Sequence, residues 1–173
     1  MKRVIVMAGG VLLLSVLACE RAGTDTTKVE LRNAQGESVG TATLEAVPDG
    51  VKIVLQASRL PPGRHGFHFH AAGRCEPPDF SSAGSHFNPQ GKEHGLENPA
   101  GPHAGDLPDL MVGPDGTVQA EVVAPHVSLE TTVANTLFQP DRTALVIHAD
   151  PDDQKTDPDG SAGARIACGI ITK

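Results

Sequence analysis

Apolar and polar side chains alternate in short segments along most of this chain. The clearest case is residues 51–56, where valine, isoleucine and leucine at odd positions alternate with lysine, valine and glutamine. A period of two predicts β-strands with one buried face, and the 3.6-residue period of helices is nearly absent. Seven segments are predicted as strands: residues 29–34, 38–47, 51–58, 66–71, 117–124, 143–149 and 166–172.

Glycine and proline separate these segments in motifs that favour turns, such as PDG at 48–50 and GPDG at 113–116. Short strands joined by such turns predict an all-β fold, a Greek-key antiparallel β-sandwich or flattened barrel of about eight strands. Residues 71–110 and 149–164 interrupt the pattern. We expect both to be long functional loops, because irregular loops of this length in compact domains usually carry function or are tied down.

The first residues predict export. Met-Lys-Arg at residues 1–3 is followed by an apolar stretch that ends in VLAC at residues 16–19. This is the plan of a signal peptide over residues 1–18. VLAC resembles the lipobox of bacterial lipoproteins, in which Cys19 is lipidated and anchors the protein to a membrane. The alternative is an ordinary secretory peptide with an incidental cysteine, which gives a periplasmic protein without an anchor.

The rest of the chain divides into a polar tether, residues 19–27, and one domain, residues 28–173, long enough for a single core. Loss of the two cations in residues 1–18 changes the formal net charge from −7 to −9. Nucleic-acid binding needs clustered Lys and Arg, so this charge argues against a nucleic-acid partner. Glu20 follows Cys19 where an aspartate would favour the inner membrane. We therefore expect the bacterial cell envelope, at the outer membrane facing the periplasm.

Two cysteines, Cys75 and Cys168, remain if Cys19 carries lipid. In an exported, oxidising compartment such a pair favours a disulfide. Closing so long a loop is worth roughly 3–5 kcal/mol in the chain-entropy model. Two free buried thiols are the alternative.

Residues that can bind metals concentrate in and beside the two predicted loops. In the segment RHGFHFH, His68 and His70 share one face of a strand and Phe67 and Phe69 the other, because residues i and i+2 point the same way. One such histidine alone is usually a surface or core residue, but a set of this size indicates a metal centre. The full set has seven members: His68, His70, His86, His94, His103, Asp106 and His148.

Three histidines and one aspartate fill the tetrahedral shell that zinc prefers, and four histidines suit copper(II). Seven ligands serve eight places if one residue belongs to both sites, and a deprotonated imidazole has a nitrogen for each metal. The residue types therefore predict one copper and one zinc per chain.

Five blocks resemble the copper/zinc superoxide dismutase family in order and spacing over nearly all of residues 28–173. They are HGFHFH at 65–70, SAGSHFNP at 82–89, HAGDL at 103–107, LVIHADPDD at 145–153 and GSAGARIACGII at 160–171. The resemblance implies disproportionation of the substrate superoxide to O₂ and H₂O₂ by Cu(II)/Cu(I) cycling, in protection of the cell envelope. It implies copper ligands His68, His70, His86 and His148, and zinc ligands His86, His94, His103 and Asp106.

The resemblance also implies individual roles. His86 is the bridging imidazolate, which takes up a proton when it releases reduced copper and returns that proton on reoxidation. Arg165 is the guanidinium that receives the superoxide anion. Asp152 is the carboxylate that links a copper histidine to a zinc histidine through their outer nitrogens, and Cys75–Cys168 is the family's disulfide.

The loop at 149–164 departs from this picture, because it carries five aspartates against a single cation, Lys155. We therefore expect local attraction of the anion to depend on Arg165, Lys155 and the metals, without an exceptional association rate. Two histidines are outside the metal set: we expect His65 to be a packing or hydrogen-bonding residue and His126 to face solvent in a loop.

Two rival functions use the same residues. A metal-handling lipoprotein, such as a copper chaperone or scavenger, would bind both metals without turnover. The presence of all seven ligands and Arg165 favours the enzyme over it. A structural or adhesion sandwich with incidental histidines would not respond to zinc. The strands leave a monomer and a homodimer equally open.

Overall fold

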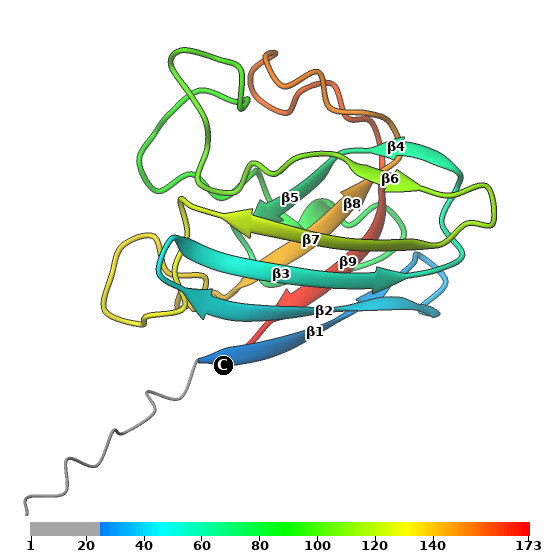
Figure 1. Ribbon diagram of the computed structural model, residues 1–173, viewed down its shortest axis with the longest axis horizontal. Coiled ribbons are helices and arrows are strands. Elements are labelled where there is room, and N and C mark those ends of the chain that lie inside the picture. Colours follow the sequence, from blue (N-terminus) through cyan, green and yellow to red (C-terminus); the bar gives the residue numbers. More distant parts are fainter. Residues whose placement is uncertain (1–24) are drawn as a thin grey trace, which may run out of the picture.

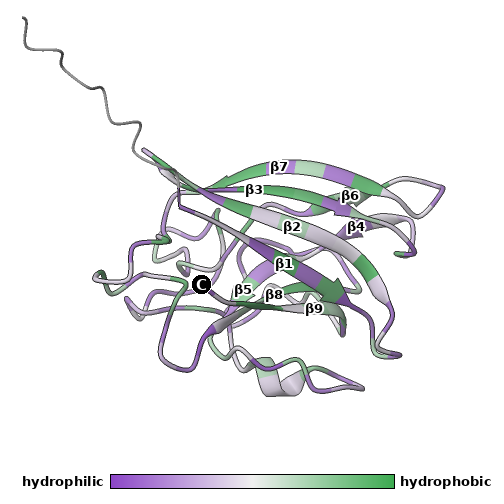
Figure 2. Ribbon diagram, turned by 90° about the horizontal axis from the view of Figure 1, so that it is seen from below, coloured by the Kyte–Doolittle hydropathy of each residue, from purple (hydrophilic) through white to green (hydrophobic). Residues whose placement is uncertain are grey.

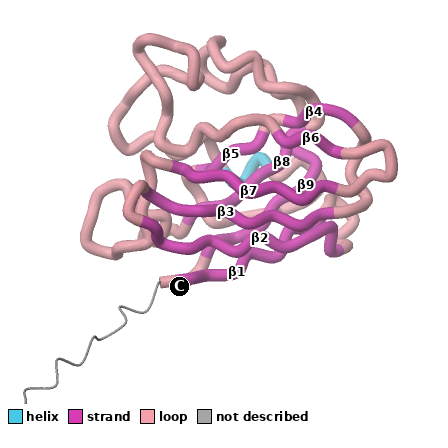
Figure 3. The backbone as a smooth tube through the Cα atoms, viewed as in Figure 1, coloured by secondary structure: helices cyan, strands magenta, loops and turns pink. Residues whose placement is uncertain are grey.

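The computed structural model describes residues 25–173, so the predicted signal peptide, Cys19 and most of the predicted tether lie outside the described residues. Strands dominate, with a single turn of 3₁₀-helix among the described residues (Figures 1 and 3). The elements are β1 (Thr26–Arg32), β2 (Ser38–Val47), β3 (Gly50–Ala57), β4 (Gly63–His65), β5 (Phe67–His70), η1 (Ser81–Ala83), β6 (Leu110–Val112), β7 (Val118–Ala124), β8 (Thr143–His148) and β9 (Arg165–Ile171). Over these residues, no helix has the length and hydrophobicity needed to cross a membrane.

All seven predicted strands are present, which confirms the all-β prediction. Two strands, β4 and β6, were not predicted. Each has three residues, too few to show a period of two, and they form a small sheet by pairing with each other. The prediction of an irregular stretch up to residue 110 is therefore wrong at its last residue, because Leu110 begins β6.

The main sheet has seven strands in the order β5-β8-β9-β1-β2-β3-β7, and every pair is antiparallel. The sheet curls so that β1, β2, β3 and β7 form one layer and β5, β8 and β9 the other (Figure 2). The chain crosses between the layers three times, after β3, after β5 and after β7, which gives the predicted Greek-key connectivity.

The core fills the space between the two layers. On β3 the predicted alternation holds, since Val51, Ile53 and Leu55 are buried and their neighbours along the strand are not. Phe67 and Phe69 of β5 are completely buried in the same core. Burial of each large apolar side chain contributes about 1.5–3 kcal/mol, so the core fixes β5 and with it the outward face of that strand.

The later part of the first long loop, in green, lies beside residues 149–164, in orange, at one end of the molecule (Figure 1). The earlier part of the first loop, with η1, packs on β8 and β9. The backbones of the two loops are joined, because Glu97 N–H donates a 3.1 Å hydrogen bond to the carbonyl of Gln154. Gly95 has φ +110°, and a Cβ at this position would collide with the backbone of Gln154. The sequence therefore needs glycine there for the loops to pack together.

A disulfide ties the first loop to the sheet. Cys75 and Cys168, 93 positions apart, are bonded with their Cα atoms 5.6 Å apart. Around the bond, Phe80 of the loop packs in a small apolar cluster with Val146 of β8. The alternative of two free thiols is not what the structure shows.

Candidate metal centre

Strand pairing brings the first histidines together. His68 and His70 point from β5 away from the core that holds Phe67 and Phe69, and β5 pairs with β8, which ends at His148. The other candidates come from the first long loop, which folds back over this face. The isolated bridge between His70 and His86 marks where it does so. All seven candidate ligands are buried.

The imidazoles of His70 and His148 direct the lone pairs of their Nε2 atoms toward each other. His70 Nδ1–H donates to the Gly84 carbonyl at 2.9 Å, and His148 Nδ1–H donates to the Gly163 carbonyl at 3.2 Å. These bonds fix the tautomers, so each Nε2 carries a lone pair. The two Nε2 atoms nevertheless lie only 3.2 Å apart. Two acceptors cannot bond each other, but both can bind one cation.

Two further nitrogens complete this group. His68 Nδ1 and His86 Nε2 are buried without a hydrogen-bond partner, an unfavourable state unless a metal binds them. His68 is held from its other side, because Asp152 Oδ2 lies 2.6 Å from Nε2. The four imidazoles, with ligand atoms within 4.8 Å of one another, match the predicted copper set His68, His70, His86 and His148.

Asp106 organises a second group. Its Oδ2 accepts the backbone N–H groups of Gly95 and His103, both at 2.9 Å. Its Oδ1 faces three ring Nδ1 atoms, at 3.0 Å for His86, 3.1 Å for His94 and 3.4 Å for His103. Three histidines and one carboxylate within 4.8 Å form a donor set that fits zinc, and it matches the predicted zinc set. His86 has one nitrogen in each group.

The electrostatics favour metal ligation over protonation in the first group. Burial lowers the pKa of His86 to about 4 and that of His148 to about 3, and it lowers the pKa of His70 well below its usual value. These imidazoles are therefore neutral with free lone pairs. His94 differs: burial lowers its pKa, but the carboxylates of Asp106 and Asp152 raise it to about 10. A bound cation would replace that proton.

Asp152 connects the two groups from outside. Its Oδ1 lies 3.0 Å from His94 Nε2 and its Oδ2 2.6 Å from His68 Nε2, where the predicted linking carboxylate belongs. The backbone N–H of Asp152 donates to Asp109 Oδ1 at 3.2 Å, and Arg64 lies 2.9 Å from the other oxygen of Asp109. Gly160, with φ +63°, packs so closely that a Cβ would collide with the Asp152 carboxylate.

Arg165 lies at the edge of the first group. Its two terminal nitrogens donate to the carbonyls of Phe80 and Gly84, both at 2.6 Å. Burial lowers the pKa of Arg165, but Asp79 and Asp159 act against that and the guanidinium stays charged. Arg165 lines a cavity of about 270 Å³ together with three of the four imidazoles, so this cavity joins the metal centre to solvent.

Several functional contacts could not have been found in the sequence. The carbonyls of Phe80, Gly84 and Gly163 carry no side-chain signal, since any residue supplies a carbonyl. Asp109 follows the HAGDL motif closely, but only the fold brings it to Asp152. Asp157 supports the second group, because it accepts the His94 N–H at 2.7 Å.

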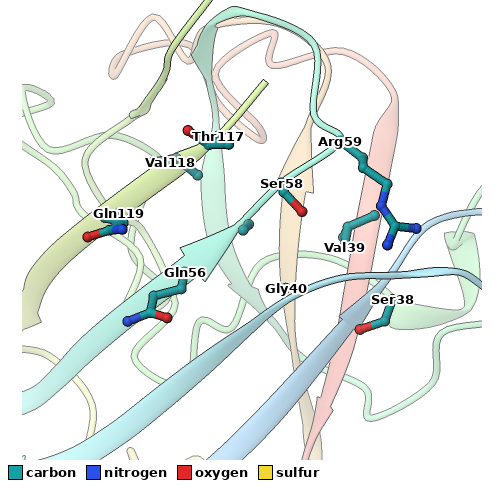
Figure 4. Close-up of a pocket in the computed structure, with 10 residues that line it drawn as sticks. Ser38, Val39, Gly40, Gln56, Ser58, Arg59, Thr117, Val118 and Gln119 are labelled. Carbon is teal, nitrogen blue, oxygen red and sulfur yellow. The ribbon is translucent and has the colours of Figure 1, made fainter. Parts of the chain in front are cut away.

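A different hollow, of about 430 Å³, lies where β2 and β7 begin and β3 ends (Figure 4). Its side chains are hydroxyls, amides and small apolar groups, and Arg59 is the single charged residue among them. It contains no carboxylate, histidine or cysteine, so it does not compete with the loop end of the molecule as the reactive site.

The two remaining histidines lie as expected. His65 is buried, with Nδ1 2.9 Å from the carbonyl of His148 and Nε2 2.8 Å from that of Pro61. This confirms a hydrogen-bonding residue, which supports the copper set through the backbone of His148. His126 is exposed, as predicted.

Comparisons with known proteins give a consistent result. Residues 38–171 match the family model described as copper/zinc superoxide dismutase (SODC). A protein of Aquifex aeolicus named superoxide dismutase [Cu-Zn] 2 is 48% identical over 167 residues, covering 96% of both chains. A crystal structure of a superoxide dismutase-like protein from Bacillus subtilis has TM-score 0.81 and 43% identity, covering 84% of this chain and 97% of that one. The Cu/Zn superoxide dismutase of Brucella abortus has TM-score 0.71 and 32% identity, covering 86% and 100%.

Proposed function

This chain belongs to the copper/zinc superoxide dismutase family, and from that premise we propose that it disproportionates superoxide to O₂ and H₂O₂ at a copper-zinc site bridged by His86. One observation carries the proposal. The two nitrogens of His86 belong to different donor groups, Nε2 to the four imidazoles and Nδ1 to the group around Asp106. A single imidazole shared in this way is what a coupled pair of metals requires.

In this proposal His68, His70, His86 and His148 hold copper. His86, His94, His103 and Asp106 hold zinc. When bound, copper supplies reversible one-electron oxidation and reduction between Cu(II) and Cu(I), and zinc supplies a fixed positive charge beside the bridge. The protein orients the ligands from behind, through the Asp152 carboxylate and the carbonyls of Gly84 and Gly163.

Arg165 and His86 act on the substrate. Arg165 presents a permanent positive charge in the cavity and holds the superoxide anion there, while the carbonyls of Phe80 and Gly84 fix its guanidinium. His86 would hold a proton at Nε2 only while that nitrogen does not bind copper, and it would donate this proton to the superoxide that is reduced; solvent would supply the second proton. Two superoxide anions and two protons thus give one O₂ and one H₂O₂.

Activity after metal loading tests the proposal. The full chain, loaded with copper and zinc, is expected to disproportionate superoxide only when copper is present, with about one copper and one zinc per chain, as one donor set for each metal requires. His148→Ala removes a ligand of the copper set alone. It should lose activity and copper while it keeps zinc, as measured by elemental analysis of the same sample. Light scattering on the metal-loaded wild-type protein measures whether it is a homodimer.

The rival reading is a metal-handling protein, and the Bacillus subtilis relative at 45% identity is named superoxide dismutase-like. Tight binding of both metals without turnover would establish that reading here. Unchanged thermal stability on addition of zinc would instead remove the metal function altogether, because a ligand that binds the folded state must stabilise it.

We also propose that the chain acts in the bacterial cell envelope, with residues 1–18 as signal peptide, residues 19–27 as lipidated cysteine and tether, and residues 28–173 as the enzyme domain. VLAC at residues 16–19 supports this, and so does the Cys75–Cys168 disulfide, since such bonds persist in oxidising compartments. The outer membrane, facing the periplasm, is the proposed location.

Replacement of Cys19 tests the anchor. Cells that express the wild type in labelled palmitate should yield a labelled protein in the membrane fraction. Cys19→Ser should be unlabelled and soluble in the periplasm, because no other anchor is proposed. A Cys19→Ser variant that stays in the membrane fraction would contradict lipidation as the means of attachment.

A further inference from the structure

Acidic side chains lie beside Arg165 at the mouth of the cavity that leads to the four imidazoles, which we call the channel. Arg165 and Asp159 both line the cavity of about 270 Å³ that leads to the imidazoles. Both terminal nitrogens of Arg165 donate to backbone carbonyls, so a part of its donor capacity is spent inside the protein. A superoxide anion that approaches this cavity meets a carboxylate as well as a guanidinium.

A second carboxylate flanks the same mouth. Asp79 precedes Phe80, whose carbonyl accepts from Arg165, and its Oδ1 accepts the N–H of Ser81, a residue of the cavity wall, at 3.0 Å. Asp159 is held in the same way, because its Oδ1 accepts the N–H of Ser161 at 3.3 Å. Both carboxylates act electrostatically on Arg165. Local turns thus fix two negative charges around one positive charge.

Other charged side chains nearby do not offset this pair of carboxylates. In the part of the chain that the structure describes, the cavity wall contains no lysine and no arginine besides Arg165. The loop cation Lys155 is engaged, since its Nζ lies 2.7 Å from Glu97. Asp152 and Asp157 of the same loop are occupied with the metal-binding histidines. Asp159 is the loop aspartate that borders the channel.

The charge of the whole protein acts in the same direction. Residues 19–173 carry a formal charge of −9, and two divalent cations leave that charge negative. At low ionic strength such a field extends about 30 Å from the surface, against about 10 Å at 0.1 M. Charge around a channel mouth changes the rate at which a charged substrate arrives.

We propose that Asp79 and Asp159 form an acidic rim that opposes entry of the superoxide anion, so that this enzyme turns over faster as ionic strength rises. The inference rests on the proposed function. Asp79 and Asp159 are the residues that lower the association rate of superoxide, because their carboxylates repel the anion. Salt screens the rim, and the anion then reaches Arg165 with less repulsion.

The test measures kcat/KM for superoxide on the metal-loaded full chain from about 0.01 M to about 0.3 M salt, a range over which the Debye length falls several-fold. The wild-type rate should rise about two- to five-fold, since one exposed charge near the path of the anion changes its association rate in water by about a factor of two. Asp79→Asn and Asp159→Asn should each raise the low-salt rate about two-fold, and the double variant about four-fold. All four proteins should converge at high salt.

Asp115→Asn is the matched control. Asp115 lies in the turn between β6 and β7, away from the cavity wall, and its Oδ1 accepts the N–H of Thr117 at 3.1 Å in a turn like those of Asp79 and Asp159. Each substitution removes one charge and keeps the acceptor oxygen. A rate that falls with salt, or rim variants that behave like Asp115→Asn, would overturn the inference.

Binding of azide, a small anion, measures the effect of the rim on anion affinity in the absence of turnover. The azide dissociation constant of the copper-loaded protein, followed by visible absorption, should decrease as salt rises and should be lower in the rim variants at low salt. This measurement separates the two proposals. If the protein does not disproportionate superoxide but shows this dependence of azide binding on salt, the proposed activity is wrong and the acidic rim stands. Azide binding that weakens with salt contradicts the rim, and so does failure to bind azide at any salt concentration, because the channel then takes no anion.

Discussion

Replacement of His86 with alanine is expected to release both metals and to reduce superoxide disproportionation to the level of the metal-free protein. His86 is the one residue common to the two donor groups, with its Nδ1 3.0 Å from Asp106 Oδ1 and its Nε2 facing the other imidazoles. Each group is left with three ligands. Loss of a residue that only orients a ligand costs about 10–100-fold in affinity, so loss of the ligand itself should cost more than about 100-fold for each metal.

Metal content after dialysis against a competing chelator, together with activity, measures this effect. His148→Ala provides the contrast, because it belongs to the four-imidazole group alone and should keep zinc. His126→Ala is the control for loss of a histidine as such, since His126 is exposed and its backbone carbonyl, not its ring, accepts from Asn135. A His86→Ala protein that retained both metals at wild-type affinity would show that His86 does not bridge them.

The alternation of side chains was enough to predict most of the fold. It identified most of the seven longer strands because they bury one apolar face, and this burial stabilises a strand in its place. Strand β8 is buried throughout and was identified by its short run of strand-forming residues. The alternation could not identify β4 and β6, with three residues each. Their position depends on the pairing of His65 with Leu110, which is a property of the assembled fold.

Strand β5 shows both the reach and the limit of the pattern. The sequence FHFH predicts one apolar and one polar face, and the structure buries all four residues. Phe67 and Phe69 enter the core as predicted. His68 and His70 are buried because two loops from distant parts of the sequence cover them, and alternation along one strand contains no information on what covers its outer face.

The chemistry of the centre was predictable as residue types and not as atoms. The sequence supplies seven ligands, but which nitrogen of each histidine is free depends on its second partner. For His70 that partner is the carbonyl of Gly84, and for His148 the carbonyl of Gly163. Both carbonyls are in the long loops. The loop backbones therefore determine the tautomers of the ligands, and their sequences do not reveal it.

The loop that holds Gly84 depends in turn on the disulfide. Cys75 bonds to Cys168 of β9, three residues after Arg165, and the residues between Cys75 and Gly84 include Phe80. Phe80 and Gly84 supply the carbonyls to which Arg165 donates. One covalent bond thus supports the cation of the channel and a ligand of the four-imidazole group at the same time.

Removal of this bond in Cys75→Ser/Cys168→Ser is expected to lower the free energy of unfolding by roughly 4–5 kcal/mol, the entropy gained by the unfolded chain when a loop of this length is opened. The melting temperature should fall by about 10–15 °C for a domain of this size. Activity per bound copper should also fall, because the carbonyls that hold Arg165 are no longer fixed.

Thermal and denaturant unfolding of the metal-free proteins measure the first effect, so that metal loss does not enter it. Cys19→Ser is the control, because Cys19 lies outside the Cys75–Cys168 pair and its replacement should leave the stability of the domain unchanged. A double variant within about 1 kcal/mol of wild type would show that the loop is held by the packing of Phe80 against Val146 and not by the disulfide. Unchanged activity per bound copper in the double variant would show that the position of Arg165 does not depend on the disulfide.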